Sequence, residues 1–560
     1  MQTQLVMQHQ FGLSILGIKP ALKIGIDIDN TLINYDAVFL LGAHELGMIV
    51  PSWHGNKNQI REYLRSRDGG EEQWQKLQGQ VYGRLITNAH IFDGAYRFLW
   101  RCHQLGIIVD LVSHKTEYGH HDESYVPLRE VAIEFLKSHG VMTGKKNLLR
   151  NICFESTREQ KVLRIIENEY DWFIDDLPEV LQDTKLPEKL GKILIDESKQ
   201  CSAGNIEYCS SWTDVENRLL GEWTEPELLS LAEFVASVPI VSVSWLSRGG
   251  NSGLLKVLTG EGEKYALKFY PESATHDRLS SEYNSFKLIR EHSLDNVPLP
   301  FRRDVNLNVA MYEWVEGDVV NRPNSKHIQQ ALEFLKTLHK LRELPEFLDF
   351  QNASAAFMSG SGFEVQLRAR VNVLNRFASE YPAMNDYLKN DLLPVIESVV
   401  QWSRTEWRIE PGYNEPLPRF KQTLSPSDFG FHNTIERKNG RLEFIDFEYF
   451  GWDDPVKLVA DFYFHPGMEI SPDLKQQWIE GAVKIYGEEI LDRLRVAWPL
   501  IGLSWCLILL NEYRTDVWSR RCAADADKLG CREEILATQL NRSRELLAKI
   551  RKTYSQPLFC

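Results

Sequence analysis

The sequence predicts an α/β fold in two parts: a doubly wound parallel sheet with a small helical cap, then an antiparallel sheet leading into a helical region. Two observations support this prediction. The first third of the chain alternates short apolar runs with amphipathic stretches, which is the rhythm of parallel strands joined by helices. Beyond it, strand-like runs with Gly-rich turns give way near Ser325 to helical periodicity, which is broken around residues 424–446.

Composition excludes several classes of protein. The chain has 560 residues, enough for several compact units, and its 43% hydrophobic and 25% charged residues are typical of soluble globular proteins. A net charge of -14 and the lack of any Lys/Arg-rich block argue against a duplex nucleic-acid binder. We therefore expect small-molecule substrates and no nucleic acid as partners, and the sequence leaves a homodimer open.

The cysteines and apolar segments predict a cytoplasmic protein. Eight cysteines occur without a C-x-x-C pair, which favours reduced thiols over a zinc site or a disulfide framework. The first residues lack the basic segment, apolar core and cleavage site of a signal peptide. The longest apolar run, residues 496–510, contains Pro499 and Gly502 and is shorter than the roughly 20 residues of a spanning helix. We expect a buried helix there and no membrane partner.

The first domain is predicted over residues 20–215, with a boundary near residue 220. Four apolar runs have the character of buried parallel strands, at residues 24–28, 107–112, 172–174 and 192–195. The long insert after the first strand predicts a helical cap over about residues 36–90. Its helix-like stretches cover residues 36–48, 59–67 and 74–85. Caps of this kind exclude water and select the substrate.

Acidic residues follow the first predicted strand. Asp27 and Asp29 stand two residues apart at its end, with Thr31 after them. One carboxylate can attack phosphorus to form an aspartyl-phosphate, and the other can protonate the leaving oxygen and later activate water. Such a pair also caps turns and helices, so the pattern alone is weak evidence.

Three later elements strengthen the hypothesis. Ser113 ends the second strand and can donate to a phosphoryl oxygen, and Lys161 near a helix start can neutralise phosphate. Asp175 and Asp176 end a third strand and are suited to Mg²⁺. Each also has an ordinary structural interpretation as a strand-end cap, a solvated charge or a turn, but the ordered series on successive strands favours a site.

This series resembles the haloacid dehalogenase (HAD) superfamily across roughly residues 20–215. The resemblance implies Asp27 as nucleophile, Asp29 as acid/base, and Ser113 and Lys161 as phosphate-binding groups. It also implies Mg²⁺ bound by Asp27, the carbonyl of Asp29, and an acid from the third strand, either Asp175 or Asp176. An aspartate at position 29 favours a phosphatase over a dehalogenase. Four residues after the second strand are equally compatible with substrate contact or a polar loop: His114, Lys115, His120 and His121.

The second part of the chain carries a different pattern. Strands are predicted at residues 240–247, 253–259 and 264–269, and a Gly-rich turn between the first two could cover phosphates. The residues of this turn are Gly249, Gly250, Asn251, Ser252 and Gly253. Lys268 follows on the third strand, and Glu282 on the next helix could pair with it. Glu313 and Trp314 have the position of a hinge that meets adenine.

The most specific string surrounds Asp428. Kinase chemistry needs a base for the acceptor hydroxyl, metal ligands and charge neutralisation. Asp428 can orient and deprotonate the hydroxyl, while Asn433 and Asp446 can hold magnesium.

Here the sequence resembles the aminoglycoside phosphotransferase/choline kinase family over about residues 235–560. The resemblance implies a protein-kinase-like domain with an N-lobe at 235–318 and a helical C-lobe at 319–560, using ATP and Mg²⁺. It implies Lys268 and Glu282 as the phosphate-anchoring pair, Asp428 as base, and Asn433 and Asp446 as metal ligands. The usual His-Gly before the base is Pro426-Ser427 here, so the local turn is expected to differ and turnover stays open.

The two patterns together predict a bifunctional phosphoryl-transfer enzyme. The pairing is similar to fusions found with bacterial surface-polysaccharide pathways, which implies a sugar or a nucleotide-linked small group as substrate. Two alternatives remain open: a kinase that inactivates aminoglycoside-type antibiotics, and a regulatory pseudokinase whose bound nucleotide gates the phosphatase.

Overall fold

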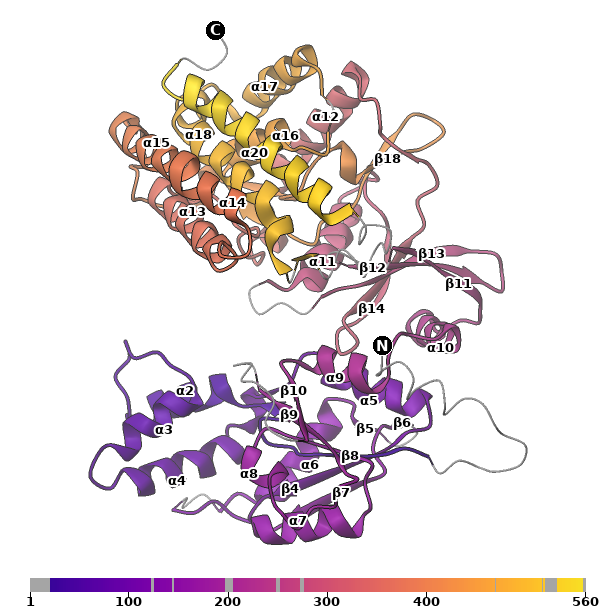
Figure 1. Cartoon of the computed structure of the whole chain (residues 1–560). Coiled ribbons are helices and arrows are strands. Elements are labelled where there is room, and N and C mark those ends of the chain that lie inside the picture. Colours follow the sequence, from indigo (N-terminus) through magenta and orange to yellow (C-terminus); the bar gives the residue numbers. More distant parts are fainter. Residues whose placement is uncertain are drawn as a thin grey trace. The chain divides into compact units, whose positions relative to one another are not determined.

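The computed structural model describes residues 21–121, 125–143, 146–196, 205–247, 252–271, 276–468, 470–515, 517–518 and 531–556. The chain forms two compact units, Met1–Ser230 (unit 1) and Leu231–Cys560 (unit 2) (Figure 1). Each unit is described by itself below.

Unit 1 is built on a six-stranded sheet with the order β10-β9-β8-β1-β4-β7, in which every neighbouring pair is parallel. Its strands are β1 (Lys23–Ile26), β4 (Ile108–His114), β7 (Asn151–Glu155), β8 (Trp172–Asp175), β9 (Gly191–Ile195) and β10 (Ile206–Cys209). The chain builds outward from β1 in one direction and then returns to build in the other. The carboxyl ends of β1, β4 and β8 therefore lie at the point where the strand order reverses, which is where α/β sheets bind ligands.

The four predicted strands are present, and the structure adds β7 and β10. These two lie at the edges of the sheet and mix polar with apolar residues. An edge strand is only partly buried, so it lacks the continuous apolar run by which central parallel strands are recognised.

Helices connect these strands, and one buried core includes Ile24, Ile26, Phe98 and Leu111. The helices are α5 (Ala95–Gln104), α6 (Leu128–Ser138), α7 (Arg158–Glu167), α8 (Pro178–Leu181) and α9 (Trp212–Leu219). Short elements complete the unit: β2 (Ile33–Asn34) paired with β3 (His90–Ile91), η1 (Ile86–Asn88), and β5 (Met142–Thr143) paired with β6 (Lys146–Asn147).

The insert after β1 forms three helices, α2 (Asp36–Glu45), α3 (Lys57–Arg65) and α4 (Gly70–Tyr82). They group together on one side of the parallel sheet (Figure 1). Phe39 of α2 stacks on Trp74 of α4 with ring centroids 5.1 Å apart. Helix α3 begins two residues before the expected stretch because the Asn56 side chain accepts from the Gln59 N–H in a capping box.

Unit 1 extends past the predicted end at 215 and the predicted boundary near 220. The buried Arg101 of α5 donates to Glu216 of α9 at 3.0 Å and to Glu227 at 2.8 Å. Glu227 belongs to α10 (Glu225–Ala236). These buried ion pairs tie sequence rich in Ser, Trp and charged residues to the domain, although such composition is typical of a linker.

Unit 2 begins with a five-stranded antiparallel sheet of order β11-β12-β13-β15-β14. Its strands are β11 (Ile240–Ser247), β12 (Gly253–Thr259), β13 (Lys264–Phe269), β14 (Pro300–Asp304) and β15 (Val309–Glu313), with α11 (Arg278–Glu291) between β13 and β14. The first three strands have the bounds expected from the sequence. We call this sheet and α11 the N-lobe.

The C-lobe follows and is mainly helical. Its helices are α12 (Ser325–Leu341), η2 (Pro345–Phe347), α13 (Gly360–Asn375), α14 (Pro382–Asp386), η3 (Tyr387–Leu392), α15 (Leu393–Glu406), η4 (Arg419–Lys421), η5 (Phe431–Asn433), α16 (Pro455–Phe464), α17 (Pro472–Tyr486), α18 (Ile490–Leu509), η6 (Leu510–Tyr513) and α20 (Arg532–Thr553). Short strands interrupt them, as the break in helical periodicity predicts: β16 (Asp318–Val319), β17 (Thr423–Ser425), β18 (Thr434–Glu436), β19 (Leu442–Phe444) and β20 (Gly451–Asp453). They form the ladders β16-β18-β19 and β17-β20.

Helix α18 contains the apolar run noted in the sequence. Together with η6 it is the one described helical segment long and apolar enough to cross a membrane, yet 78% of its most apolar window is buried inside the protein. It packs against α15, α16 and α20. The predicted buried helix is therefore present.

Candidate active sites

The site in unit 1 centres on the buried Lys161. Its ammonium donates to Asp27 Oδ1 at 2.6 Å and to Asp175 Oδ2 at 2.7 Å. Asp27 directly follows β1, and Asp175 ends the neighbouring β8. Lys161 lies in the first turn of α7, which starts with a capping box between Thr157 and Gln160. Adjacent parallel strands thus bring together acids that are far apart in the sequence.

The charges at this cluster fit a divalent cation. Burial raises the pKa of Asp27 well above its ordinary value; Lys161 opposes the shift and Asp175 reinforces it. Burial and the neighbouring Asp175 likewise raise the pKa of Asp176 to about 7. One carboxylate oxygen from each of the three aspartates lies within 4.8 Å of the others. Oxygen ligands at this spacing suit Mg²⁺, whose charge would relieve the repulsion among them.

Ser113 lies in β4, beside β1. Its hydroxyl is buried and has no hydrogen-bond partner among the described residues. Buried polar groups are normally paired, so an unpaired hydroxyl at a strand end indicates a position for a ligand oxygen. Thr31 donates to Asp176 Oδ1 at 3.3 Å and so holds one of the acids in place.

Asp29 lies outside the carboxylate cluster. Its two oxygens are 2.9 and 2.8 Å from the ammonium of Lys115, which is buried and lies 4.5 Å from the Tyr82 ring centroid. The sequence left Lys115 open as a site residue; the structure brings it to Asp29. Of the residues around it, His114 bonds to the Ser156 carbonyl at 3.0 Å and His121 approaches Glu72 of α4 at 3.5 Å. His120 is exposed.

The first cluster in unit 2 centres on Lys268 of β13. Its ammonium lies 2.6 Å from Glu282, 2.5 Å from Asp446 and 3.5 Å from Glu448. The Tyr270 hydroxyl donates to the same Glu282 carboxylate at 2.7 Å and fixes it. The expected pair of Lys268 and Glu282 is thus formed, and Asp446 joins it.

Glu448, two residues after Asp446, was not among the predicted site residues. Burial raises the pKa of Glu448 to about 7, opposed by Lys268 and reinforced by Asp446. Oxygens of Glu282, Asp446 and Glu448 lie within 4.8 Å of one another, so this group also fits a hard cation. Asp446 adopts φ +67°, a left-handed conformation that costs free energy for a non-glycine residue and recurs at functional sites.

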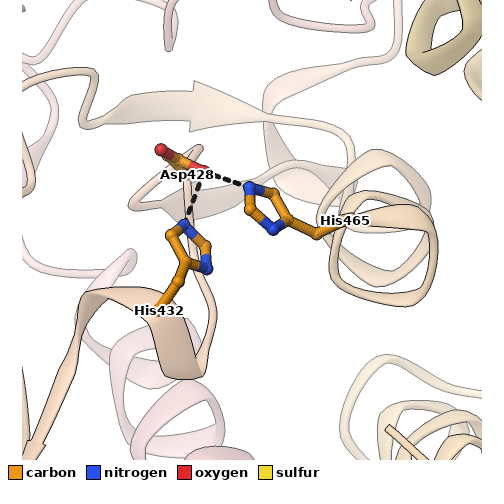
Figure 2. A group of neighbouring side chains, drawn as sticks. All are labelled: Asp428, His432 and His465. Atoms are coloured by element: carbon orange, nitrogen blue, oxygen red, sulfur yellow. Dashed lines mark hydrogen bonds and ion pairs between the residues drawn. The ribbon is translucent and has the colours of Figure 1, made fainter. Parts of the chain in front are cut away.

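The second cluster in unit 2 surrounds Asp428 (Figure 2). His432 Nε2 is 3.0 Å and His465 Nε2 is 3.5 Å from Asp428 Oδ1, and the two imidazoles stack with centroids 3.8 Å apart. The Gly467 N–H donates to His465 Nδ1 at 3.1 Å. A neutral imidazole that accepts at Nδ1 carries its proton on Nε2, so this assigned tautomer directs an N–H at Asp428. That tautomer orients the carboxylate and does not favour binding of a metal through Nε2.

These contacts keep Asp428 ionised. Burial would raise its pKa, but the hydrogen bond from His432 and, when the two imidazoles are protonated, the charges of His432 and His465 lower the pKa below its ordinary value. The amide nitrogen of Asn433 donates to the Asp428 carbonyl at 3.0 Å, which leaves the amide oxygen as the atom that would bind a cation. Neither histidine was singled out from the sequence. His432 lies between Asp428 and Asn433 in the sequence, whereas His465 directly follows α16.

The turn before Asp428 explains the departure from the family pattern. Ser427 adopts φ +68°, the left-handed region that favours glycine. The Ser427 N–H donates to Ser425 Oγ at 3.0 Å, and the Asp428 N–H donates to the Pro426 carbonyl at 3.0 Å. The Pro-Ser pair therefore forms a closed turn, with local hydrogen bonds that offset part of the strain.

The predicted nucleotide-contacting residues are placed only in part. Gly249, Gly250 and Asn251 lie outside the described residues, while Ser252 precedes β12 and Gly253 begins it. The Glu313 N–H donates to the Leu299 carbonyl at 2.8 Å, and the Glu313 carboxylate pairs with Arg437 at 2.7 Å. Trp314 lies under the ammonium of Lys256, 4.6 Å from the ring centroid. The arginine partner of Glu313 lies 124 positions away, so the sequence could not reveal this pair, and the contact of the hinge with adenine stays a prediction.

Residues 248–496 match the model of the phosphotransferase enzyme family. This part of the chain is therefore a domain of that family. A comparison with curated proteins finds no significant match.

Solved structures give distant likenesses. A spectinomycin phosphotransferase in complex with ADP and spectinomycin is 13% identical, with a TM-score of 0.42, over 60% of this chain and 99% of that one. A Plasmodium vivax ethanolamine kinase is 16% identical, with a TM-score of 0.37, over 56% of this chain and 83% of that one. A Streptococcus pneumoniae choline kinase is 13% identical, with a TM-score of 0.38, over 57% and 98%. Likenesses this distant carry no argument about activity.

Proposed function

We propose that unit 2 is an ATP-dependent kinase that phosphorylates a hydroxyl group of a small molecule. Two distinct groups of residues support this assignment most directly: Lys268 with its carboxylates, and Asp428 with its histidines. Phosphoryl transfer needs an anchor for the phosphates and a base for the acceptor, in different places. The family match of residues 248–496 agrees with this division.

Each residue then has a distinct task. Lys268, held by Glu282, binds phosphate oxygens, and Asp428 orients the acceptor hydroxyl. Asp428 takes the hydroxyl proton as the acceptor oxygen attacks the γ-phosphorus and the bond from that phosphorus to the bridging oxygen breaks, which releases ADP. Asp446, Glu448 and Asn433 provide oxygen ligands for Mg²⁺, which when bound neutralises phosphate charge. The histidines beside Asp428 keep its carboxylate ionised and fixed.

Acceptor-dependent release of ADP tests this proposal. The wild-type protein is incubated with ATP, Mg²⁺ and panels of sugars, nucleotide-linked small molecules, amino alcohols and aminoglycosides. We expect ADP release with one class, and a loss of about 10²–10⁴-fold for Asp428→Asn, the range for removal of a positioned base. ATP binding without acceptor-dependent ADP release would instead favour the regulatory alternative. Turnover confined to aminoglycosides would favour antibiotic inactivation.

We propose further that unit 1 is a Mg²⁺-dependent phosphatase of the HAD type. The contact of Lys161 with both Asp27 and Asp175 supports it, since one ammonium beside a nucleophile and a metal ligand can also bind the phosphoryl group. Asp27 attacks phosphorus and forms an aspartyl-phosphate while the bond to the leaving oxygen breaks. Asp29 protonates that oxygen, then takes a proton from the water that hydrolyses the intermediate. Ser113 donates to a phosphoryl oxygen.

Hydrolysis of p-nitrophenyl phosphate tests this second proposal. We expect Mg²⁺-dependent release of nitrophenolate by the wild-type protein and none by Asp27→Asn. Glu62→Gln, which changes an exposed acid of α3, serves as the matched control. Equal phosphate release by the wild type and Asp27→Asn would refute the assigned nucleophile.

One pathway could use both activities, with the kinase acting on a sugar or related metabolite of a bacterial surface-polysaccharide pathway and the phosphatase on a neighbouring intermediate. Fusion keeps two successive sites at a high effective concentration. A coupled assay that converts one metabolite through both steps would test this arrangement.

A further inference from the structure

Two lysines in unit 1 lie outside the cluster of Asp27, Lys161 and Asp175. Lys115 follows β4 and contacts Asp29 through both carboxylate oxygens. Lys57 is the first residue of α3 in the helical cap. The chemistry assigned above requires neither of them, because Lys161 already supplies the cation beside the nucleophile.

Two aromatic rings in contact link the two lysines. The Lys57 ammonium lies 5.5 Å from the Phe39 ring centroid, and the Lys115 ammonium lies 4.5 Å from that of Tyr82. Phe39 and Tyr82 pack edge to face with centroids 5.7 Å apart. Rings from α2 and α4 thus hold an ammonium from the cap and one from the core on adjacent faces.

Lys57 is close enough to two acids of the site, Asp176 and Asp29, to feel their charges. Burial lowers the pKa of Lys57, and the carboxylates of Asp176 and Asp29 oppose that shift. Among the described residues, no carboxylate forms an ion pair with Lys57. A partly buried ammonium without an ion-pair partner costs free energy that a bound anion would recover.

A purely structural role is the alternative to ligand binding. Lys115 could serve only to hold Asp29, and Lys57 only to stabilise the cap against the core. In that case removal of Lys57 would lower the affinity for every substrate by the same factor. A role in recognition predicts a loss that depends on the charge of the leaving group.

We propose that Lys57 and Lys115 form a second anion-binding site beneath the cap, which selects phosphomonoesters whose leaving group carries another phosphate or a carboxylate. This inference rests on the phosphatase function proposed for unit 1. Lys161, Ser113 and Mg²⁺ would bind the transferred phosphoryl group. The second anion would lie on the cap side, against the ammonium groups of Lys57 and Lys115. In a site shielded from water, each such contact is stronger than on the surface.

Ligand binding to the Asp27→Asn protein tests the proposal without turnover. Isothermal titration calorimetry with Mg²⁺ compares fructose 1,6-bisphosphate with fructose 6-phosphate, and 3-phosphoglycerate with glycerol 3-phosphate. The first pair adds a phosphate and the second a carboxylate, so the two arms distinguish the kind of anion. We expect at least one compound with two anionic groups to bind about tenfold or more tightly than its partner with one, which corresponds to roughly 1.4 kcal/mol.

Variants of Lys57 separate recognition from stability. In the Asp27→Asn background, Lys57→Gln and Lys57→Met should reduce this affinity ratio to below about twofold, and the methionine keeps an apolar stem should the glutamine variant fold poorly. Lys76→Gln changes an exposed lysine of α4 and should leave the ratio as it was. Binding to unit 2 is common to all variants and does not contribute to the difference between them.

The outcomes are distinct. Equal affinities within both pairs, or an equal loss for both members of a pair in Lys57→Gln, would overturn the second anion site. A Lys57-dependent ratio in a protein that hydrolyses no phosphate ester would keep the binding site and refute the proposed phosphatase. Hydrolysis of p-nitrophenyl phosphate, together with equal affinities within both ligand pairs, would keep the proposed phosphatase and refute the second anion site.

Discussion

In unit 1 the buried Lys161 touches Asp27, the assigned nucleophile, at 2.6 Å. In unit 2 the buried Lys268 touches Glu282 and Asp446, while the assigned base Asp428 contacts two histidines instead. The difference follows from the chemistry proposed for each site. A carboxylate that attacks phosphorus must share the cation that binds the phosphoryl group, whereas one that accepts a proton from a hydroxyl works best apart from it. Loss of the lysine should therefore impair phosphate binding and the nucleophile together in unit 1. In unit 2, phosphate binding and the base should be impaired by different substitutions.

Removal of each lysine gives the largest contrast. We expect Lys161→Met to abolish phosphate-ester hydrolysis, by about 10³-fold or more in kcat, because the nucleophile and the phosphate lose the same cation. Lys268→Met should mainly raise the KM for ATP, because Asp428 keeps its own partners. Steady-state kinetics of both reactions in both variants measures this. A loss confined to kcat in Lys268→Met would contradict the separation.

The same change in unit 2 should also destabilise the fold. Without Lys268, three acids of that cluster are left with fewer counter-charges, which costs about 3–5 kcal/mol at neutral pH. Urea unfolding measures the loss, and millimolar Mg²⁺ should restore part of it because a cation replaces the missing charge. Lys264→Met is the matched control, since Lys264 lies on the same strand but forms a solvent-exposed pair with Glu316, and exposed pairs contribute little to stability. Comparable losses in the two variants would show that the buried cluster contributes little.

His465→Gln sharpens the comparison at the base. We expect kcat of the kinase to fall about tenfold while the affinity for ATP stays within twofold, because the histidine positions Asp428 and lies apart from Lys268. His339→Gln is the control: His339 is half-buried in the same lobe and bonds to Thr423 at 3.0 Å. Nucleotide titration measures the affinity of each variant for ATP, and initial rates measure its kcat. A rise in the Kd for ATP with unchanged kcat would exclude a positioning role.

The smallest expected effect concerns pH. Burial lowers the pKa of His465 to about 4, and burial together with Arg342 lowers that of His339 to about 4. An unfolded histidine has a pKa of about 6.5, so between these values the unfolded chain binds more protons than the folded one. The contribution of these two histidines to the stability of unit 2 should therefore be fully present above about pH 6.5 and be lost as the pH falls toward 4. The urea midpoint of His339→Gln should fall less steeply over this range; curves parallel to wild type would contradict the assignment.

The sequence located most of both sites because their residues end strands. Asp27, Asp175 and Ser113 each follow or end an apolar run, and a parallel sheet brings the ends of its strands to one edge. The same reasoning missed His465 and left Lys115 open between a substrate contact and a polar loop, because no local pattern distinguishes either residue from other polar residues after a helix or strand. Nor does any local pattern record that the carboxylate of Glu313 pairs with Arg437, 124 positions away.

By itself, then, the sequence determined the order of the elements, the two series of acids and lysines, and the presence of a cap between residues 36 and 90. Periodicity and residue type are local properties, so they survive without coordinates. Only the tertiary structure decided which partner each charge has: Lys161 between two aspartates, Lys268 among three acids, and a histidine pair at Asp428. Those contacts join residues up to 178 positions apart, and no local pattern records such a pairing.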